Sequence, residues 1–365
     1  MYVKELELKN FRNYESLDLK FDPRINLITG RNAQGKTNLI EAVYLISMGR
    51  SFRAGRDSEM IRFGQNEALV RAEAVKAVMD TRIDICISRK SKKYIKKDGK
   101  QLHKTSELLN NIFIVAFTPE DLRIVKDEPE KRRRFIDKEL AQIQPAYYLC
   151  LSRYKKVLQQ RNSCLKETPV RPSMLSLWDM QLVQYGSDLM RMRKAFIERL
   201  SVFSGKIHDS ITNGQEKLEI QYESNIPYEE DAALRQDRLM EALEKSRDTD
   251  IKMKTTSRGP HKDDLRFLVN GVNARKYGSQ GQQRTCALSL KLAELDFIRQ
   301  ETGENAILLL DDVMSELDQS RRAFLIDSLE ENQIFITMTE AEDELIRAYG
   351  NPTVFSVQDG HVTLL

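Results

Sequence analysis

The segment from Gly30 to Thr37 reads GRNAQGKT, and it constrains the fold of this chain more than any other feature. It fits the pattern G-x-x-x-x-G-K-[ST], in which glycines let the backbone curl around phosphate groups. A short strand-like run, INLIT, precedes it, and NLIEAVYLISM, which has helical spacing, follows it. This order surrounds the phosphates with loop N–H groups and a helix N-terminus. We therefore predict a nucleotide site in which Lys36 neutralises phosphate charge and the Thr37 hydroxyl is a Mg²⁺ ligand.

A nucleotide site of this kind also needs a carboxylate at the end of a hydrophobic strand. The segment AILLLDD supplies two, because Asp311 and Asp312 directly follow an aliphatic run. Asp311 suits the metal, directly or through water, and Asp312 is placed to polarise an attacking water. The sequence therefore predicts one Mg²⁺–nucleotide site assembled from opposite ends of the chain.

A second glycine loop, YGSQGQQRT, runs from Tyr277 to Thr285 and leads into another apolar helical pattern. Taken alone, it could simply cap a helix. A polar loop at a helix N-terminus is also a second site for an anion. A metabolic kinase or a GTPase would explain the first loop and the acidic strand, but not this one.

The secondary structure expected from the sequence changes twice along the chain. Its 365 residues are enough for two lobes with separate cores. Strand-like segments dominate the first and last thirds, whereas three-to-four spacing of apolar residues dominates the middle. We predict an α/β phosphate-loop lobe built from residues 1–122 and 251–365, with residues 123–250 inserted as a mainly helical lobe.

The order of these motifs resembles the ATP-binding cassette superfamily, in which the second glycine loop contacts the γ-phosphate held by a partner subunit. Six segments further resemble the RecF family of SMC-like DNA-repair ATPases: LKNFRNY, LITGRNAQGKTNLIEAVYLISMGRSFR, FTPEDLRIVKDEPEKRRRFID, RGPHKDDLRFLVNG, YGSQGQQRT and LLLDDVMSELD. The resemblance implies a weak DNA-dependent ATPase that forms a homodimer on ATP and works with RecO and RecR proteins in recombinational repair and gap filling.

The resemblance also assigns roles to individual residues. Lys36 and Asp312 would be catalytic, Thr37 and Asp311 would hold Mg²⁺, and Ser315 to Asp318 would face the dimer partner. ATP would contact a longer set, which comprises Arg12, Asn13, Gly30, Arg31, Asn32, Ala33, Gln34, Gly35, Lys36, Thr37, Asn38 and, from the partner's side, Ser279, Gln280 and Gly281.

Two positions depart from the cassette pattern. Transporter cassettes carry a histidine after the strand that begins here with IFI. In this chain Thr337, Met338 and Thr339 occupy that place, and neither threonine can act as a base near neutral pH. The mid-chain glutamine is not evident, and Glu120 and Asp121 occupy the comparable place. We therefore expect slow turnover.

His261, in GPHKDD, leaves two interpretations open. It could take part in catalysis, or it could be a hydrogen-bonded structural histidine.

Basic residues cluster in three segments, although the formal net charge is only +3. Arg89 to Lys104 contains eight Lys or Arg and one acid, and KRRR and SRYKK follow it. Such runs form either a solvated face or a track for phosphates. We predict DNA contacts from Lys92, Lys93, Lys96, Lys97, Arg132 and Arg133. No zinc finger, helix-turn-helix or single-strand stacking platform is visible, so we expect backbone contacts with little sequence readout.

Composition limits the remaining classes of protein. The chain is 31% charged and 41% hydrophobic, as in soluble globular proteins. Its four cysteines lie far apart, which favours reduced thiols and a cytoplasmic location. We predict an ATP-driven DNA clamp. The alternatives are a nucleotide-gated protein scaffold and a phosphate-loop kinase for a small molecule.

Overall fold

The computed structural model describes residues 1–328, 331–339 and 352–365. Its contacts divide the chain into two compact units. The first unit contains Met1–Leu122 and Glu294–Leu365, and the second contains Arg123–Ala293. The first segment of the first unit ends at Leu122, and residues 251–293, which we expected in the ATPase lobe, group with the second unit.

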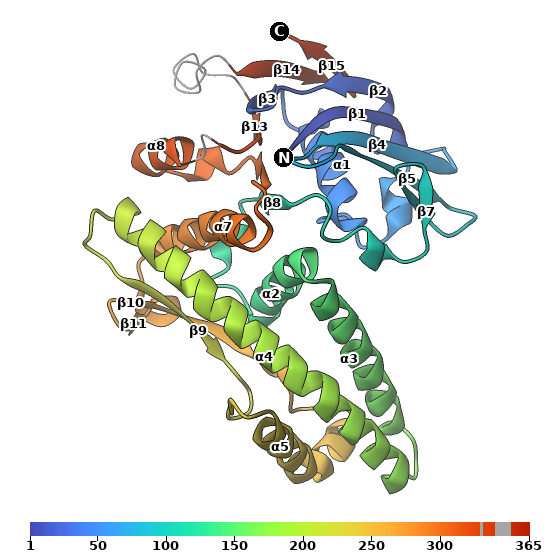
Figure 1. Ribbon diagram of the computed structural model, residues 1–365, viewed down its shortest axis with the longest axis vertical. Helices are drawn as coiled ribbons and strands as arrows, with labels where there is room; N and C mark the ends of the chain where they lie inside the picture. The colour runs from blue at the N-terminus through green and yellow to red at the C-terminus, as the bar shows by residue number, and fades with distance from the viewer. Residues whose placement is uncertain (329–330, 340–351) are drawn as a thin grey trace. The chain divides into compact units, whose positions relative to one another are not determined.

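An antiparallel sheet forms one layer of the first unit (Figure 1). Alternating buried and more exposed residues, as along β4, give it one face that packs on the core. In spatial order its strands are β2 (Tyr14–Lys20), β1 (Tyr2–Phe11), β4 (Glu67–Val75), β5 (Thr81–Ser88), β6 (Tyr94–Lys97) and β7 (Lys100–Leu102).

The second sheet of this unit is mainly parallel and combines both ends of the chain. Its order is β15 (His361–Leu364), β14 (Thr353–Gln358), β3 (Ile25–Thr29), β13 (Ile334–Met338), β12 (Ile307–Asp311) and β8 (Ile114–Phe117). β12 and β13 are buried along their whole length, which explains their continuous apolar sequences. Because β3 lies between β13 and β14, the early phosphate-loop strand is completed by strands from the far end of the sequence.

Helices and short turns connect these strands. α1 (Lys36–Met48) follows β3 directly and is buried at almost every residue, so its sequence lacks a clear polar face. The others are η1 (Asp57–Met60), η2 (Thr105–Glu107), η3 (Asp121–Arg123), η5 (Met314–Glu316) and α8 (Gln319–Asp327). The carboxyl ends of β3, β12 and β13 lie at one edge of the sheet, where open α/β sheets bind ligands.

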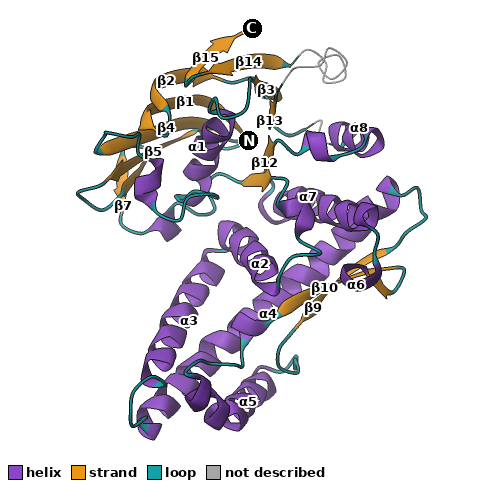
Figure 2. Cartoon of the chain, turned by 180° about the vertical axis from the view of Figure 1, so that it is seen from behind, coloured by secondary structure: helices purple, strands orange, loops and turns teal. Residues whose placement is uncertain are grey.

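Helices dominate the second unit (Figure 2). Its long helices are α2 (Pro129–Ile143), α3 (Pro145–Cys164), α4 (Pro172–Ile211) and α5 (Ala232–Met253), and the first three begin at a proline, the residue favoured at the first helical position. A small sheet contains β9 (Leu218–Glu223), β10 (Asp264–Val269) and β11 (Val272–Asn273), followed by α6 (Ala274–Tyr277) and α7 (Gln280–Thr302); η4 (Pro260–Lys262) precedes β10.

The pairing of β10 with β9 explains why residues after 251 belong to this unit. Six residues of β10 align antiparallel with β9, which the α4–α5 connection carries. The sequence marks β10 as a strand but not its partner. Within the described residues, no helix combines the length and apolar content needed to cross a bilayer.

Candidate nucleotide site

The phosphate loop has a backbone that only glycine can adopt at its first position. Gly30 has φ 143°, and an added Cβ would lie 2.3 Å from the carbonyl oxygen of Val357. Further along, the Lys36 Nζ donates to the carbonyl oxygens of Gly30 and Arg31 at 2.5 and 3.0 Å. Burial lowers the pKa of Lys36, while the nearby charges of Asp311 and Asp312 raise it. The Lys36 ammonium is therefore held in the mouth of the loop, where phosphate oxygens would replace the two carbonyls.

Contacts from both ends of the chain hold the loop in place. The Asn13 Nδ2 donates to the Gln34 carbonyl at 2.7 Å, and the Tyr14 hydroxyl donates to the Gly35 carbonyl at 3.0 Å. From the β14–β15 turn, the N–H of Asp359 donates to Gln34 Oε1 at 2.6 Å. The Asn13 side chain also accepts a 2.9 Å hydrogen bond from Asn38. The structure thus brings Asn13, Gln34 and Asn38 together, and their contact with ATP stays a prediction.

Arg12, which was predicted to contact ATP, is held by two glutamates within the unit. Its Nε and Nη2 donate to the two carboxylate oxygens of Glu41 at 2.7 and 2.6 Å, and its Nη1 donates to the Glu59 carbonyl at 2.7 Å. Glu41 lies in α1 and is fully buried. The Arg12 fork therefore anchors α1 to the β1–β2 turn, and it orders the loop through that helix.

The two predicted Mg²⁺ ligands meet directly. The Thr37 hydroxyl donates to Asp311 Oδ1 at 3.0 Å, and the Thr337 hydroxyl donates to the same oxygen at 2.9 Å. Burial raises the pKa of Asp311, whereas the hydrogen bonds from Thr337 and Thr37 lower it. A hydroxyl and a carboxylate are hard oxygen donors of the kind that Mg²⁺ prefers. The donor set therefore fits a Mg²⁺–nucleotide complex.

Asp312 has an unusual backbone conformation next to this pair. Its φ is 56°, in the left-handed region, and its side chain is exposed. The N–H of Asp312 donates to the Thr337 hydroxyl at 2.8 Å, and its carbonyl accepts from Ser315 at 2.8 Å. Residues held in such conformations cluster at functional sites. Sequence analysis considered Thr337 only as a residue that cannot replace the cassette histidine as a base. The structure shows that its hydroxyl contacts both acidic residues, a role that the sequence did not indicate.

The second glycine loop lies in the other unit and begins α7. The Ser279 hydroxyl accepts from the N–H of Gln282 at 3.1 Å, and Gln282 Oε1 accepts from the N–H of Ser279 at 2.9 Å. This reciprocal pair is a capping box. Ser279 and Gln280 remain exposed at the start of the helix. The loop is thus a helix cap that also presents polar groups at a helix N-terminus.

Two other candidate residues have structural partners. Asp121 Oδ2 accepts from the N–H and hydroxyl of Thr118, at 2.8 and 2.9 Å, and so fixes the loop where the mid-chain glutamine was sought. His261 lies within hydrogen-bonding distance of the Tyr154 hydroxyl (2.7 Å) and the Thr256 carbonyl (2.9 Å). Burial lowers the pKa of His261 to about 4. The structural interpretation of His261 is the one that these contacts support.

The residues predicted to contact DNA differ in how far their side chains are exposed to solvent. Arg132 is 0% exposed, and its guanidinium pairs with Asp264 at 2.5 and 2.9 Å. The prediction that Arg132 contacts DNA is wrong, because this side chain lies in the core of the helical unit. Arg133 is half-buried and donates to the Asp263 carbonyl at 2.8 Å.

The lysines between β5 and β7 also differ in exposure and in whether their ammonium groups already bind the protein. Lys93 binds the Gly49 carbonyl at 2.6 Å and Asp57 at 2.8 Å, and Lys97 donates to Asn111. Lys96 is half-buried and lies 5.7 Å from the centre of the Tyr94 ring, whereas Lys92 is exposed. Lys92 and Lys96 are therefore better placed for a phosphate than Lys93 and Lys97.

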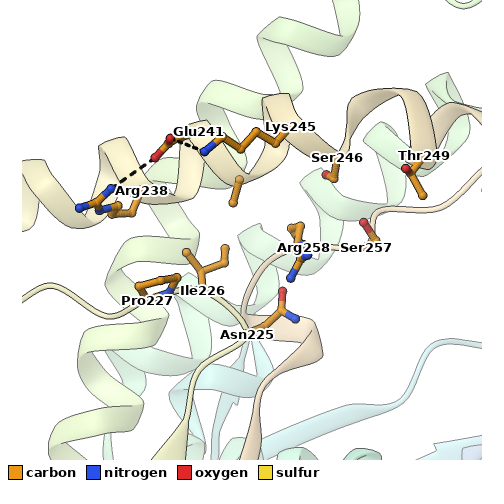
Figure 3. A pocket seen from close by; sticks show the side chains of 11 residues that line it. Asn225, Ile226, Pro227, Arg238, Glu241, Lys245, Ser246, Thr249, Ser257 and Arg258 are labelled. Carbon is orange, nitrogen blue, oxygen red and sulfur yellow. Dashed lines mark hydrogen bonds and ion pairs between the residues drawn. The ribbon is translucent and has the colours of Figure 1, made fainter.

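A pocket of about 460 Å³ lies in the helical unit, along α5 (Figure 3). Glu241 is ion-paired there with both Arg238 and Lys245, and Arg258 lies on the opposite wall. All its lining residues fall between Asn225 and Arg258. It contains no residue of the phosphate loop.

Known proteins resemble this chain along its whole length. The family model described as RecF/RecN/SMC N terminal domain matches residues 2–363. The DNA replication and repair protein RecF of Lachnospira eligens is 43% identical over 367 residues, covering 99% of both chains. The RecF of Clostridioides difficile is 42% identical over 364 residues, covering 99% of this chain and 98% of its own.

Solved structures agree with these relatives. A structure described as the recombination mediator protein RecF-ATPrS in the RecFOR pathway has a TM-score of 0.94 and 39% identity, covering 100% of this chain and 98% of its own. An Smc head bound to the C-winged helix domain of ScpA, at 16% identity and a TM-score of 0.56, shares the fold alone. The predicted cassette-type α/β fold, with its inserted helical segment, is confirmed. By sequence and by structure alike, this chain belongs to the RecF family of DNA replication and repair proteins.

Proposed function

We propose that this protein is a DNA-binding ATPase of recombinational repair and gap filling, in which ATP binding drives dimerisation around DNA and slow hydrolysis releases it. One observation carries the proposal: the hydroxyls of Thr37 and Thr337 both donate to one carboxylate oxygen of Asp311, at the edge of the sheet beside the phosphate loop. A solved relative is described as RecF-ATP, which supports ATP as the nucleotide.

The residues at this edge have separate roles in hydrolysis. Lys36 neutralises phosphate charge, and Thr37 and Asp311 hold Mg²⁺, which supplies electrostatic stabilisation of the charge that develops on the phosphates. Asp312 orients the attacking water, and Thr337 positions both acidic residues. Transporter cassettes usually have Glu at the position of Asp312. The Asp312 side chain is one methylene shorter, which accords with slow turnover.

The second glycine loop acts on the partner's nucleotide. Ser279 and Gln280 are exposed at a helix N-terminus, where N–H groups and the helix dipole favour an anion. We assign Ser279, Gln280 and Gly281 to the γ-phosphate bound by the opposite protomer, and Ser315–Asp318 to the dimer face. ATP would then join two copies of this chain.

Exposed lysines and the relatives support the role in DNA metabolism. Relatives that cover the whole chain are named for DNA replication and repair, and two matched RecF structures are described as belonging to the RecFOR pathway. We propose RecO and RecR proteins as partners, a cytoplasmic location, and contacts from Lys92 and Lys96 to the DNA backbone.

Light scattering of the purified protein tests the central claim. We expect a dimer with Mg²⁺–ATP and a monomer with ADP or without nucleotide, and a Lys36→Ala variant that stays monomeric throughout. A mass that does not change between ATP and ADP would contradict ATP-driven dimerisation.

A further inference from the structure

Phe63 is 99% exposed, the highest value among the large hydrophobic side chains of the described residues. Single exposed hydrophobic residues are ordinary on protein surfaces and by themselves imply nothing. Phe63 differs because its backbone is fixed and its neighbours are basic.

Hydrogen bonds hold the turn Arg62–Gln65, here called the Phe63 turn, against the antiparallel sheet. The N–H of Arg62 donates to the Asn10 carbonyl at 2.8 Å, and the N–H of Gln65 closes the turn on the Arg62 carbonyl at 3.0 Å. Gly64 supplies the positive φ of 81° that the turn requires. The aromatic ring is therefore presented to solvent by an ordered backbone.

The same turn is joined to the lysine-rich segment. The Arg89 Nε donates to the Gln65 carbonyl at 3.1 Å, and the Arg89 N–H donates to the Asn66 carbonyl at 2.9 Å. Arg89 is exposed, and the exposed Lys90 and Lys92 follow it directly.

Acidic residues also lie around the turn, but they offset the positive charge only in part. Glu15 pairs with Arg62 at 2.9 Å, Glu59 lies at the end of η1, and Glu67 is exposed at the start of β4. Arg62 is thereby neutralised, whereas Arg89, Lys90 and Lys92 form no ion pair with any carboxylate in the described part of the chain. The surface around the ring therefore keeps positive charge that complements phosphates.

We propose that Phe63 stacks on an unpaired base of single-stranded DNA while Arg89, Lys90 and Lys92 contact the neighbouring phosphates. An aromatic ring beside a basic track is the arrangement by which proteins hold single strands, because every base has a face on which a ring can stack. The bases inside a duplex already stack on each other and offer no such face. The inference rests on the proposed DNA binding and adds a contact to bases, which sequence analysis did not predict.

Fluorescence anisotropy with three DNA probes tests the inference on the full-length protein. The probes are a single-stranded oligonucleotide, an abasic strand of the same length, and a duplex whose ends are closed by non-nucleotide linkers, so that it offers no unpaired base. We expect Phe63→Ala to weaken binding of the normal strand by about 5- to 100-fold, the range that one base–aromatic stack supplies. It should leave the abasic strand and the closed duplex unaffected, and Phe63→Trp should restore binding of the normal strand.

Two further variants separate stacking from charge and from general surface effects. Val78 is 94% exposed at the opposite end of β4, so Val78→Ala should change none of the three affinities. Lys90→Glu with Lys92→Glu should weaken all probes and reduce the salt dependence by roughly 0.7 to 0.9 per lost phosphate contact, whereas Phe63→Ala should not change it.

The outcomes distinguish this inference from the proposed function. If the wild-type protein binds none of the probes, with or without ATP, the proposed DNA binding fails and the stacking role fails with it. If it binds DNA but Phe63→Ala affects normal and abasic strands equally, the stacking role alone is overturned. The stacking role is also overturned if Phe63→Ala has no effect on any probe. That result would indicate that the Phe63 ring contacts a protein partner instead of DNA.

Discussion

At the scale of single residues, the proposed Mg²⁺ ligand Asp311 is a buried carboxyl group whose ionisation is unfavourable in the free protein. Burial raises the pKa of Asp311, so the folded, nucleotide-free protein resists its ionisation. A carboxyl group with a raised folded pKa loses stability as the pH rises through its unfolded value, and that loss persists at neutral pH. The ionised Asp311 side chain therefore does not stabilise the free protein, which accords with its proposed role as a Mg²⁺ ligand.

Replacing Asp311 with Asn should separate these two effects. The amide oxygen can still accept from Thr37 and Thr337, but the buried charge is gone. We expect the melting temperature of the nucleotide-free variant to equal or exceed that of the wild type. We also expect ATP hydrolysis to fall by about 100-fold, the effect of losing one strong electrostatic contact. A marked drop in the melting temperature without nucleotide would contradict this account.

His261 should make stability depend on pH in a predictable direction. Its folded pKa of about 4 lies below the ordinary value of 6.5. The stability from neutral His261 is therefore fully present above pH 6.5 and is lost as the pH falls toward 4. Relative to a His261→Gln variant, the wild type should lose about 1.4 kcal/mol per pH unit below 6.5. Urea unfolding of both proteins between pH 7.5 and 4.5 measures this difference, and parallel curves would refute it.

At the scale of elements, α2 contains arginines with opposite environments. Arg132 is buried against Asp264 and also donates to the carbonyls of Ile124 and Asp127. Arg134, two residues later, is exposed and pairs with Glu130 one turn earlier at 2.6 Å. The basic run that looks like one patch in the sequence is therefore divided between the core and the surface of the helix.

These two arginines provide a matched pair of variants. Arg132→Ala should lower the free energy of unfolding by about 3–5 kcal/mol, because it removes the buried guanidinium that pairs with Asp264 and leaves only Arg275, at 3.8 Å, beside that carboxylate. The carbonyls of Ile124 and Asp127 lose the same donor. Arg134→Ala should change the same quantity by less than about 0.5 kcal/mol. Guanidinium denaturation measures both, and equal effects would mean that the Arg132–Asp264 pair does not hold the helical unit together.

At the scale of the whole molecule, the two loops predict complementation between variants. Ser279→Arg should block ATP-driven dimerisation but spare ATP binding, because its own phosphate loop is intact. Lys36→Ala should bind ATP poorly, while its own second glycine loop remains intact and available to a partner's nucleotide. A mixed dimer contains one fully intact composite site, so mixing the two variants should restore part of the ATP-dependent dimer.

Cross-linking of differently tagged variants, with and without ATP, measures that complementation. Each variant alone serves as its own control, since both of its composite sites are broken. Loss of ATP binding by the Ser279→Arg monomer would show that the second loop acts on its own protomer's nucleotide.

Much of the fold and part of the site could be predicted, because their signals are contiguous in the sequence. GRNAQGKT and the aliphatic run before Asp311 carry their own chemistry in order. Arg132 was misplaced although a signal existed, since Phe135, Ile136 and Glu139 are buried on the same face of α2. The contact of Thr337 with Asp311, the pairing of β10 with β9 and the exposure of Phe63 depend on distant segments meeting, which no local pattern encodes.

The support of the phosphate loop by the last strands has a consequence for synthesis on the ribosome. β3 is flanked by β13 and β14, and the Gln34 side chain and carbonyl are held by the N–H groups of Asp359 and Gly360. A nascent chain therefore carries its phosphate loop through most of translation without the strands that shape it. We therefore expect a ribosome-bound chain to bind nucleotide only after the residues near 360 have emerged and completed the loop.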